Sequence, residues 1–137
     1  MNHFIKPELL APAGTIESFH AAIEAGADAV YLGLNGFNAR LRAKNFTINT
    51  LSSLVPYAHA RKRKIYVTLN TLVKQSELEE CVHLLYQIDQ IGIDAVIVQD
   101  LGIADICRKA FPRLTIHAST QMTIHNSLGM KAAAEVS

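Results

Sequence analysis

Apolar runs rich in β-branched and aromatic residues recur along the chain, and a turn-forming or polar residue follows each of them. They lie at positions 8–11, 29–32, 64–69, 95–98 and 115–116. Short runs of this kind, bounded by Gly, Pro or Asp, are typical of strands that are buried on both faces of a parallel sheet. We therefore predict five strands, the first of which stops at the turn formed by Pro12, Ala13 and Gly14.

The first two segments between these strands carry apolar residues at helical spacing. The hydroxyl of Thr15 is suited to cap a helix that has Glu17 in its first turn and ends at Gly26. Residues 47–61 predict a second helix, and Pro56 is expected to kink or split it.

Three further helices continue the pattern. Ser76 is placed to cap the third helix, and Asn126 to open the last one. The fourth is marked by apolar residues that follow the fourth strand: Ile103, Ile106, Cys107 and Ala110. Strand and helix thus alternate five times, which predicts an α/β fold whose strands pair in parallel through right-handed crossovers.

Two stretches of the chain repeat one pattern. Residues 25–33 (AGADAVYLG) and 91–99 (IGIDAVIVQ) each contain a Gly that ends a helix, an Asp in a short turn, and a strand. Such units build either a (β/α)₈ barrel or an open doubly wound sheet. A complete barrel needs about 250 residues, so length alone favours a flavodoxin-like sheet with strand order 2-1-3-4-5.

Composition narrows the class of protein. The 137 residues are half apolar, which fits one globular domain, and the net charge of +1 gives no bulk attraction to nucleic acid. The two cysteines do not form a disulfide framework, and no stretch resembles a signal peptide or a membrane span. A reduced, cytoplasmic setting is expected.

Six blocks in order carry a resemblance to a known family: PELLAPAG, GADAVYLG, the loop from Asn38 to Phe46, YVTLNTL, GIDAVIVQD and HASTQ. Together they resemble the amino-terminal part of peptidase family U-32, the collagenase-like proteases. The resemblance implies a TIM-like barrel with strands in sequential order, of which residues 1–137 are the amino-terminal portion, truncated before the rest. The last three blocks are most similar to the branch that hydroxylates a cytidine in 23S ribosomal RNA without oxygen.

The resemblance also implies a 4Fe-4S cluster, held by four cysteines that follow the fifth strand. Cys81 and Cys107 lie on apolar helix faces without CxxC spacing, so we expect them to be buried hydrophobes and the chain to bind no cofactor by itself. Part of a barrel exposes unpaired strand edges and an apolar inner face. We therefore expect the isolated chain to self-associate.

Candidate site residues follow the strands, because chemistry gathers at the carboxyl ends of parallel strands. We assign catalytic roles to Asp100 and His117, and substrate binding to five residues: Arg40, Asn70, Gln99, Ser119 and Gln121. All are expected to share one pocket, with the side chains of His117, Ser119 and Gln121 on one side of the chain. The structural alternatives are that Asp100 caps the next helix and that Ser119 closes a turn.

Two basic segments differ in their expected position. Arg40, Arg42 and Lys44 follow the second strand at the site rim, where guanidinium groups could hold RNA phosphate or a small anionic substrate. Residues 61–64 (RKRK) end a helix at the opposite rim, where cations suit the helix dipole, and we interpret them as solvated charge.

Motifs for other chemistries are absent from the sequence. His117 and His125 lack zinc-ligand spacing, and no GxGxxG, GxxxxGK[ST] or GxSxG motif occurs. No local pattern pairs a nucleophile with a base, so a peptidase function depends on the family resemblance alone. Three functions remain open: part of an iron–sulfur-dependent RNA hydroxylase, a collagenase-like peptidase, or a folding fragment without activity of its own.

Overall fold

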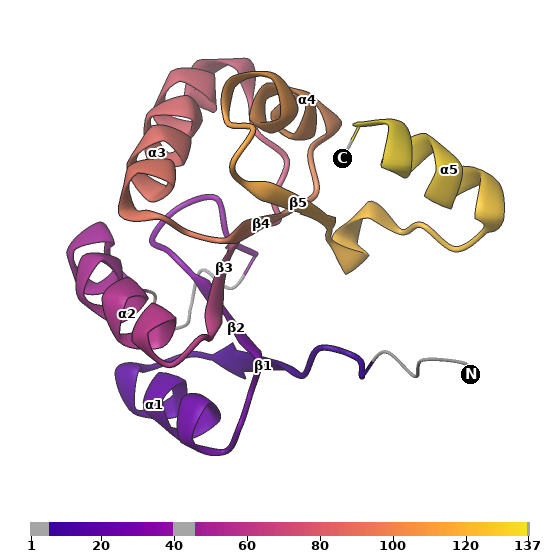
Figure 1. Ribbon diagram of the computed structural model, residues 1–137. Helices are drawn as coiled ribbons and strands as arrows, with labels where there is room; N and C mark the ends of the chain where they lie inside the picture. The colour runs from indigo at the N-terminus through magenta and orange to yellow at the C-terminus, as the bar shows by residue number, and fades with distance from the viewer. Residues whose placement is uncertain (1–5, 40–45, 137) are drawn as a thin grey trace.

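The computed structural model, which describes residues 6–39 and 46–136, contains one parallel sheet of five strands (Figure 1). The strands are β1 (Leu10–Ala13), β2 (Ala29–Gly33), β3 (Lys64–Leu69), β4 (Ala95–Val98) and β5 (Thr115–Ala118). They are hydrogen-bonded in the order β1-β2-β3-β4-β5. The predicted sequential order is confirmed, and the flavodoxin-like order is wrong.

The helices are α1 (Ile16–Glu24), α2 (Ile48–Ala60), α3 (Leu78–Ile91), α4 (Leu101–Ala110) and α5 (Ser127–Val136), the last of which packs against α4. The first four lie along the convex side of the curved sheet, and α5 lies beyond β5 (Figure 1). Two short 3₁₀ turns, η1 (Gln75–Glu77) and η2 (Thr120–Met122), precede α3 and α5. In the described part of the chain β1 and β5 do not pair, so the sheet is open.

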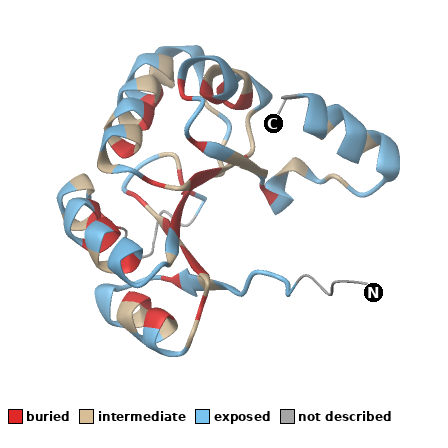
Figure 2. Ribbon diagram, in the orientation of Figure 1, coloured by how far each residue is buried: buried red, intermediate tan, exposed pale blue. Residues whose placement is uncertain are grey.

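Most residues of the central strands β2, β3 and β4 are buried (Figure 2). Alternate strand residues such as Val30, Val67 and Val96 have no exposed surface and pack into the helix-side core. On the concave face a smaller cluster gathers around the strand residues Ala29, Tyr66 and Ala95. The helix side therefore provides most of the hydrophobic stabilisation, and the concave face is left accessible at its ends.

The repeated Asp of the sequence has the same task in both places. Asp28 Oδ2 accepts the backbone N–H of Leu9 at 2.9 Å, and Asp94 Oδ2 accepts that of Ile65 at 2.8 Å. Each carboxylate thus satisfies a donor at the start of a neighbouring strand. The Asp that is repeated in the sequence therefore helps to align adjacent strands in both places.

Several predicted boundaries are wrong. The first strand runs two residues later than predicted, because Pro12 and Ala13 pair with β2. A proline fits there since β1 is an edge strand, whose outer side needs no N–H donor. Pro56 does not split α2, and Ser76 lies inside η1 rather than capping α3, whose N-cap is Glu77. Asn126 does accept a hydrogen bond from Gly129 N–H at the start of α5.

None of the helices within residues 6–39 and 46–136 is long and apolar enough to span a membrane. The two cysteines, on α3 and α4, are buried in the helix-side core, as predicted. Burial raises the pKa of the Cys81 thiol to about 11 and that of Cys107 to about 12.

The buried thiols should react slowly while the protein is folded. At pH 8 a thiol with a pKa near 11 has about 100-fold less thiolate than an ordinary cysteine, and the thiolate is the reactive form. We expect modification by an aromatic disulfide reagent to be at least about 100-fold slower in buffer than in guanidinium chloride. Equal rates in the two solvents would contradict the burial of Cys81 and Cys107.

Candidate functional site

A cleft of about 550 Å³ opens on the concave face at the carboxyl ends of the strands. Every strand or the loop after it contributes to its wall. The polar lining residues, which define the carboxyl-end cleft, are Asn38, Thr68, Asn70, His117, Ser119, Thr120 and Gln121. Tyr31 and Ile97 add apolar surface from β2 and β4.

The loop after β2 folds back into the cleft because Gly33 has no side chain. A Cβ on Gly33 would lie 1.8 Å from Nδ2 of Asn38, so only glycine leaves room for that amide. Asn38 is 3% exposed, and its Oδ1 accepts a hydrogen bond from the Thr68 hydroxyl at 3.4 Å. Thr68 also donates to the Leu32 carbonyl at 3.2 Å. Sequence reasoning missed Asn38 and Thr68 as site residues, although a Gly that ends a strand is a signal for close packing.

Asn70 joins the same loop to β3. Its Oδ1 accepts the backbone N–H of Ala39 at 3.0 Å. This bond fixes the side-chain amide at the mouth of the cleft, and the other end of the amide is a donor that points to no partner among the described residues. Asn70 is therefore oriented to bind a hydrogen-bond acceptor.

His117 lines the cleft from β5. Its ring packs on Tyr66, with ring centroids 4.9 Å apart. The Tyr66 hydroxyl donates to Glu8, which also forms an ion pair with Lys64 at 2.8 Å. These two partners hold the pKa of Glu8 below its usual value, while burial and Glu8 together raise the pKa of Tyr66. The chain of contacts fixes the orientation of the His117 ring from below.

The turn after β5 completes the wall. Ser119 is 5% exposed, and its Oγ accepts the N–H of Gln121 at 3.2 Å, so the predicted turn-closing role is confirmed. The backbone carbonyl of Gln121 accepts from the side chain of Gln99 at 3.4 Å. Ser119 thus has a structural role and also lines the cleft.

Asp100 is the N-cap of α4, as the structural alternative predicted. Its Oδ1 accepts the N–H groups of Gly102 and Ile103, at 2.8 and 3.2 Å. Its Oδ2 accepts the N–H of Val73 at 3.2 Å, which ties the loop after β3 to the start of α4. Because both oxygens hold backbone donors, the carboxylate is a positioning group and not a free base.

The predicted shared pocket is formed in part. The structure brings Asn70, His117, Ser119 and Gln121 together in the carboxyl-end cleft. Gln99 and Asp100 instead line a neighbouring cavity between α4 and α5, which Gln121 also borders. Arg40, Arg42 and Lys44 lie outside the described residues.

The described side chains fit neither a single-metal site nor a 4Fe-4S cluster. The described part of the chain holds no cluster of three or more His, Cys, Asp or Glu. His125 Nδ1 contacts the Thr123 carbonyl at 2.8 Å and does not approach the cleft lining. The chain has only Cys81 and Cys107, both buried with raised pKa, so its own residues do not fit a four-cysteine iron–sulfur cluster.

A substitution tests the structural role of Asp100. Asp100→Ala leaves three backbone donors without their acceptor, and we expect the free energy of unfolding to fall by about 2 kcal/mol. Urea unfolding followed by circular dichroism measures the change. The matched control is Asp105→Ala on the same helix, whose half-buried carboxylate forms only surface ion pairs with Arg108 and Lys109, which contribute little. Equal unfolding midpoints for the two variants would contradict the capping role.

Comparisons with known proteins agree with one another. The sequence profile of peptidase family U32 matches residues 14–137. The 23S rRNA 5-hydroxycytidine synthase of Escherichia coli is 45% identical over 117 residues, which cover 85% of this chain and 17% of that protein. The tRNA hydroxylation protein P of Helicobacter pylori is 38% identical over 122 residues, covering 88% of this chain and 29% of that protein.

A solved U32 peptidase has the same fold, with a TM-score of 0.75 at 12% identity. The superposition covers 99% of this chain and 59% of that structure. The chain thus spans less than a third of the length of the two curated relatives and just over half of the solved chain.

Proposed function

The chain belongs to peptidase family U32, and we propose that it forms part of an enzyme that hydroxylates a cytidine in RNA. Relatives named for rRNA and tRNA hydroxylation support this proposal. In the proposed enzyme the five-stranded sheet is one portion of a TIM-like barrel, completed by further βα units. Any iron–sulfur cluster would have to be bound by segments other than residues 1–137. An RNA substrate also fits a cytoplasmic enzyme.

The composition of the carboxyl-end cleft is the observation that carries this proposal. Among the described residues, its polar groups are side-chain amides, hydroxyls and one imidazole, and none of these lining residues carries a carboxylate or an ammonium group. Amides offer a donor and an acceptor side by side, which suits the edge of a nucleobase. Pockets for bases that have been turned out of a stack combine such groups with an aromatic face.

Each residue then has a distinct role. Tyr31 offers a ring at the cleft wall against which a base can stack. Asn70 and Gln121 bind the edge of the base, and Asn38, held by Thr68, sets the depth of the cleft. His117, whose ring packs on Tyr66, stays the proposed catalytic group, because its imidazole nitrogens can donate or accept a hydrogen bond. The segment with Arg40, Arg42 and Lys44 stays a predicted contact for RNA phosphate.

The geometry favours hydroxylation over proteolysis. A serine or threonine nucleophile needs an adjacent base to remove its proton. The hydroxyl of Thr68 donates to the Leu32 carbonyl, and that of Ser119 caps η2. Among the described residues no hydrogen bond joins His117 to Thr68, Ser119 or Thr120, so this part of the cleft shows no serine or threonine paired with a base.

Removing an amide from the cleft tests the base-binding role. We expect Gln121→Ala and Asn70→Ala each to weaken binding of a cytidine-containing RNA loop by about fivefold to tenfold, the value of one hydrogen bond. Isothermal titration calorimetry with the wild-type chain and the variants measures the effect.

Asn49→Ala serves as the matched control, because Asn49 is an exposed amide on α2 that does not line the cleft. Thermal unfolding of Gln121→Ala should match that of the wild-type protein, since this side chain is exposed. Unchanged RNA affinity in both cleft variants would refute the proposed site.

Self-association follows from the open sheet. Leu10 at the edge strand is 40% exposed, and the concave face carries the partly buried side chains of Tyr31 and Ile97. We propose that a second copy covers this face when the chain is studied alone. Light scattering should show a mass above that of the monomer, and Leu10→Lys should lower it; a compact monomer at high concentration would contradict the proposal.

A further inference from the structure

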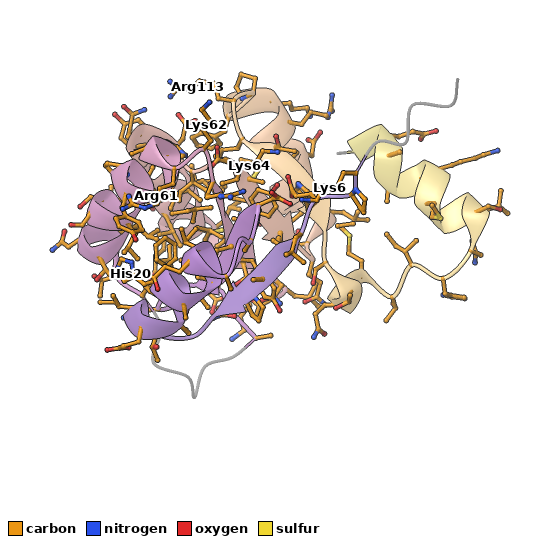
Figure 3. The ribbon with its side chains drawn as sticks, turned by 60° about the horizontal axis from the view of Figure 1, so that its bottom comes forward. Lys6, His20, Arg61, Lys62, Lys64 and Arg113 are labelled. Carbon is orange, nitrogen blue, oxygen red and sulfur yellow. The ribbon has the colours of Figure 1, made fainter. Side chains whose placement is uncertain are left out.

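Cations gather at the rim opposite the cleft, where the helices end and the strands begin. Lys6, Arg61, Lys62, Lys64 and Arg113 are labelled in Figure 3, in which Lys62, Lys64 and Arg113 lie toward the upper edge. Helix carboxyl termini alone account for cations in such places.

Most of the cations are neutralised by carboxylates. Arg63 pairs with Asp28 at 2.9 Å, Lys64 with Glu8 at 2.8 Å, and Arg113 with Asp89 at 2.6 Å. Lys6 lies 4.0 Å from Asp28. Arg61 and Lys62 differ, because neither forms an ion pair with any residue that the structure describes.

Arg61 is held in place by contacts that leave its charge uncompensated. Its guanidinium group lies 3.7 Å from the centroid of the Tyr57 ring and donates to the Tyr57 carbonyl at 3.2 Å. The edge of the same ring meets His20 of α1, with centroids 4.6 Å apart. A guanidinium fixed in this way loses little side-chain freedom when it binds an anion.

Lys62 occupies a backbone position that favours glycine. Three helices end in the same left-handed turn, in which two N–H groups bond back to the last helical carbonyls. The left-handed residue is Gly26 after α1 (φ 96°) and Gly92 after α3 (φ 87°), but it is Lys62 after α2 (φ 57°). In each turn this residue donates to the carbonyl three positions earlier, with Lys62 N–H bonding to His59 at 2.9 Å.

The three helix ends differ in the residue at the left-handed position, and this difference indicates that the Lys62 side chain has a function. If only the turn mattered, glycine would suit all three places, because a side chain raises the energy of the left-handed conformation. The chain instead places a lysine there, directly after Arg61 in sequence and without an ion pair to any described residue. Strain of this kind is evidence for a role of the side chain.

We propose that Arg61 and Lys62 form a contact for the phosphate backbone of single-stranded RNA, remote from the cleft. This contact rests on the proposed RNA function and gives the same substrate a second point of attachment to the protein. Strand β3, which starts directly after this turn and ends beside Asn70, is about 20 Å long at about 3.3 Å per residue. A single-stranded RNA segment of a few nucleotides can span that length.

The substitution Lys62→Gly tests the inference, because it removes the charge and relieves the turn. We expect the melting temperature to rise by about 2–4 °C. Binding of a fluorescein-labelled, unstructured 15-nucleotide RNA, followed by anisotropy, should weaken about threefold to tenfold at low salt. The slope of log affinity against log salt should fall by about 0.7, the value for one phosphate contact on a single strand.

Matched variants complete the experiment. Lys62→Arg should retain the affinity of the wild-type chain, and Arg61→Ala should lose affinity without the rise in melting temperature. Lys131→Ala, at an exposed lysine on α5, should leave the salt slope unchanged.

Two outcomes would overturn the inference in distinguishable ways. If the wild-type chain binds the RNA but Lys62→Gly has the same affinity and salt slope, the rim contact is wrong and the proposed function stands. If the wild-type chain binds no RNA at all, the proposed function fails together with the contact.

Discussion

The rest of the structure depends on one constraint: the central strands β2, β3 and β4 must bury their helix-side residues completely. Val30, Val67 and Val96 have no exposed surface, and burying a side chain of that size stabilises a fold by roughly 1.5–3 kcal/mol. Side chains alternate along a strand, so this requirement also decides which residues face the concave side. Tyr31, Tyr66 and Ile97 are placed there by the packing of their neighbours.

Parallel pairing then separates the two rims of the sheet. All strands end on one rim, where the loops are free to carry Asn38, Asn70 and Gln121 into the cleft. All strands begin on the other rim, where Asp28 and Asp94 bind backbone donors of adjacent strands. The same connectivity therefore assigns recognition to one rim and strand alignment to the other.

The sequence predicts the interior of this sheet better than its margins. The bounds of β3 and β4 agree with the prediction, since both are central strands with continuous apolar runs. β1 and β5 are edge strands with few buried residues, so their periodicity is weak and their predicted bounds are wrong. For the site, the rule of strand ends locates Asn70 and His117. It misses Asn38, whose place depends on the missing Cβ of Gly33, and it cannot tell that Asp100 turns toward backbone donors.

A net charge of +1 argues against bulk attraction to RNA, yet charge alone does not decide binding. At the rim where the strands begin, Asp28 neutralises Arg63 and Glu8 neutralises Lys64, and these ion pairs hold the strand starts together. Positive charge that is available to an anion must therefore come from residues that form none of these ion pairs. Such residues lack a carboxylate partner among the described residues and have a backbone conformation that packing does not require. The net charge of a chain shows neither property. In a nearly neutral chain, the ion-pair network is therefore a better guide to anion binding than composition.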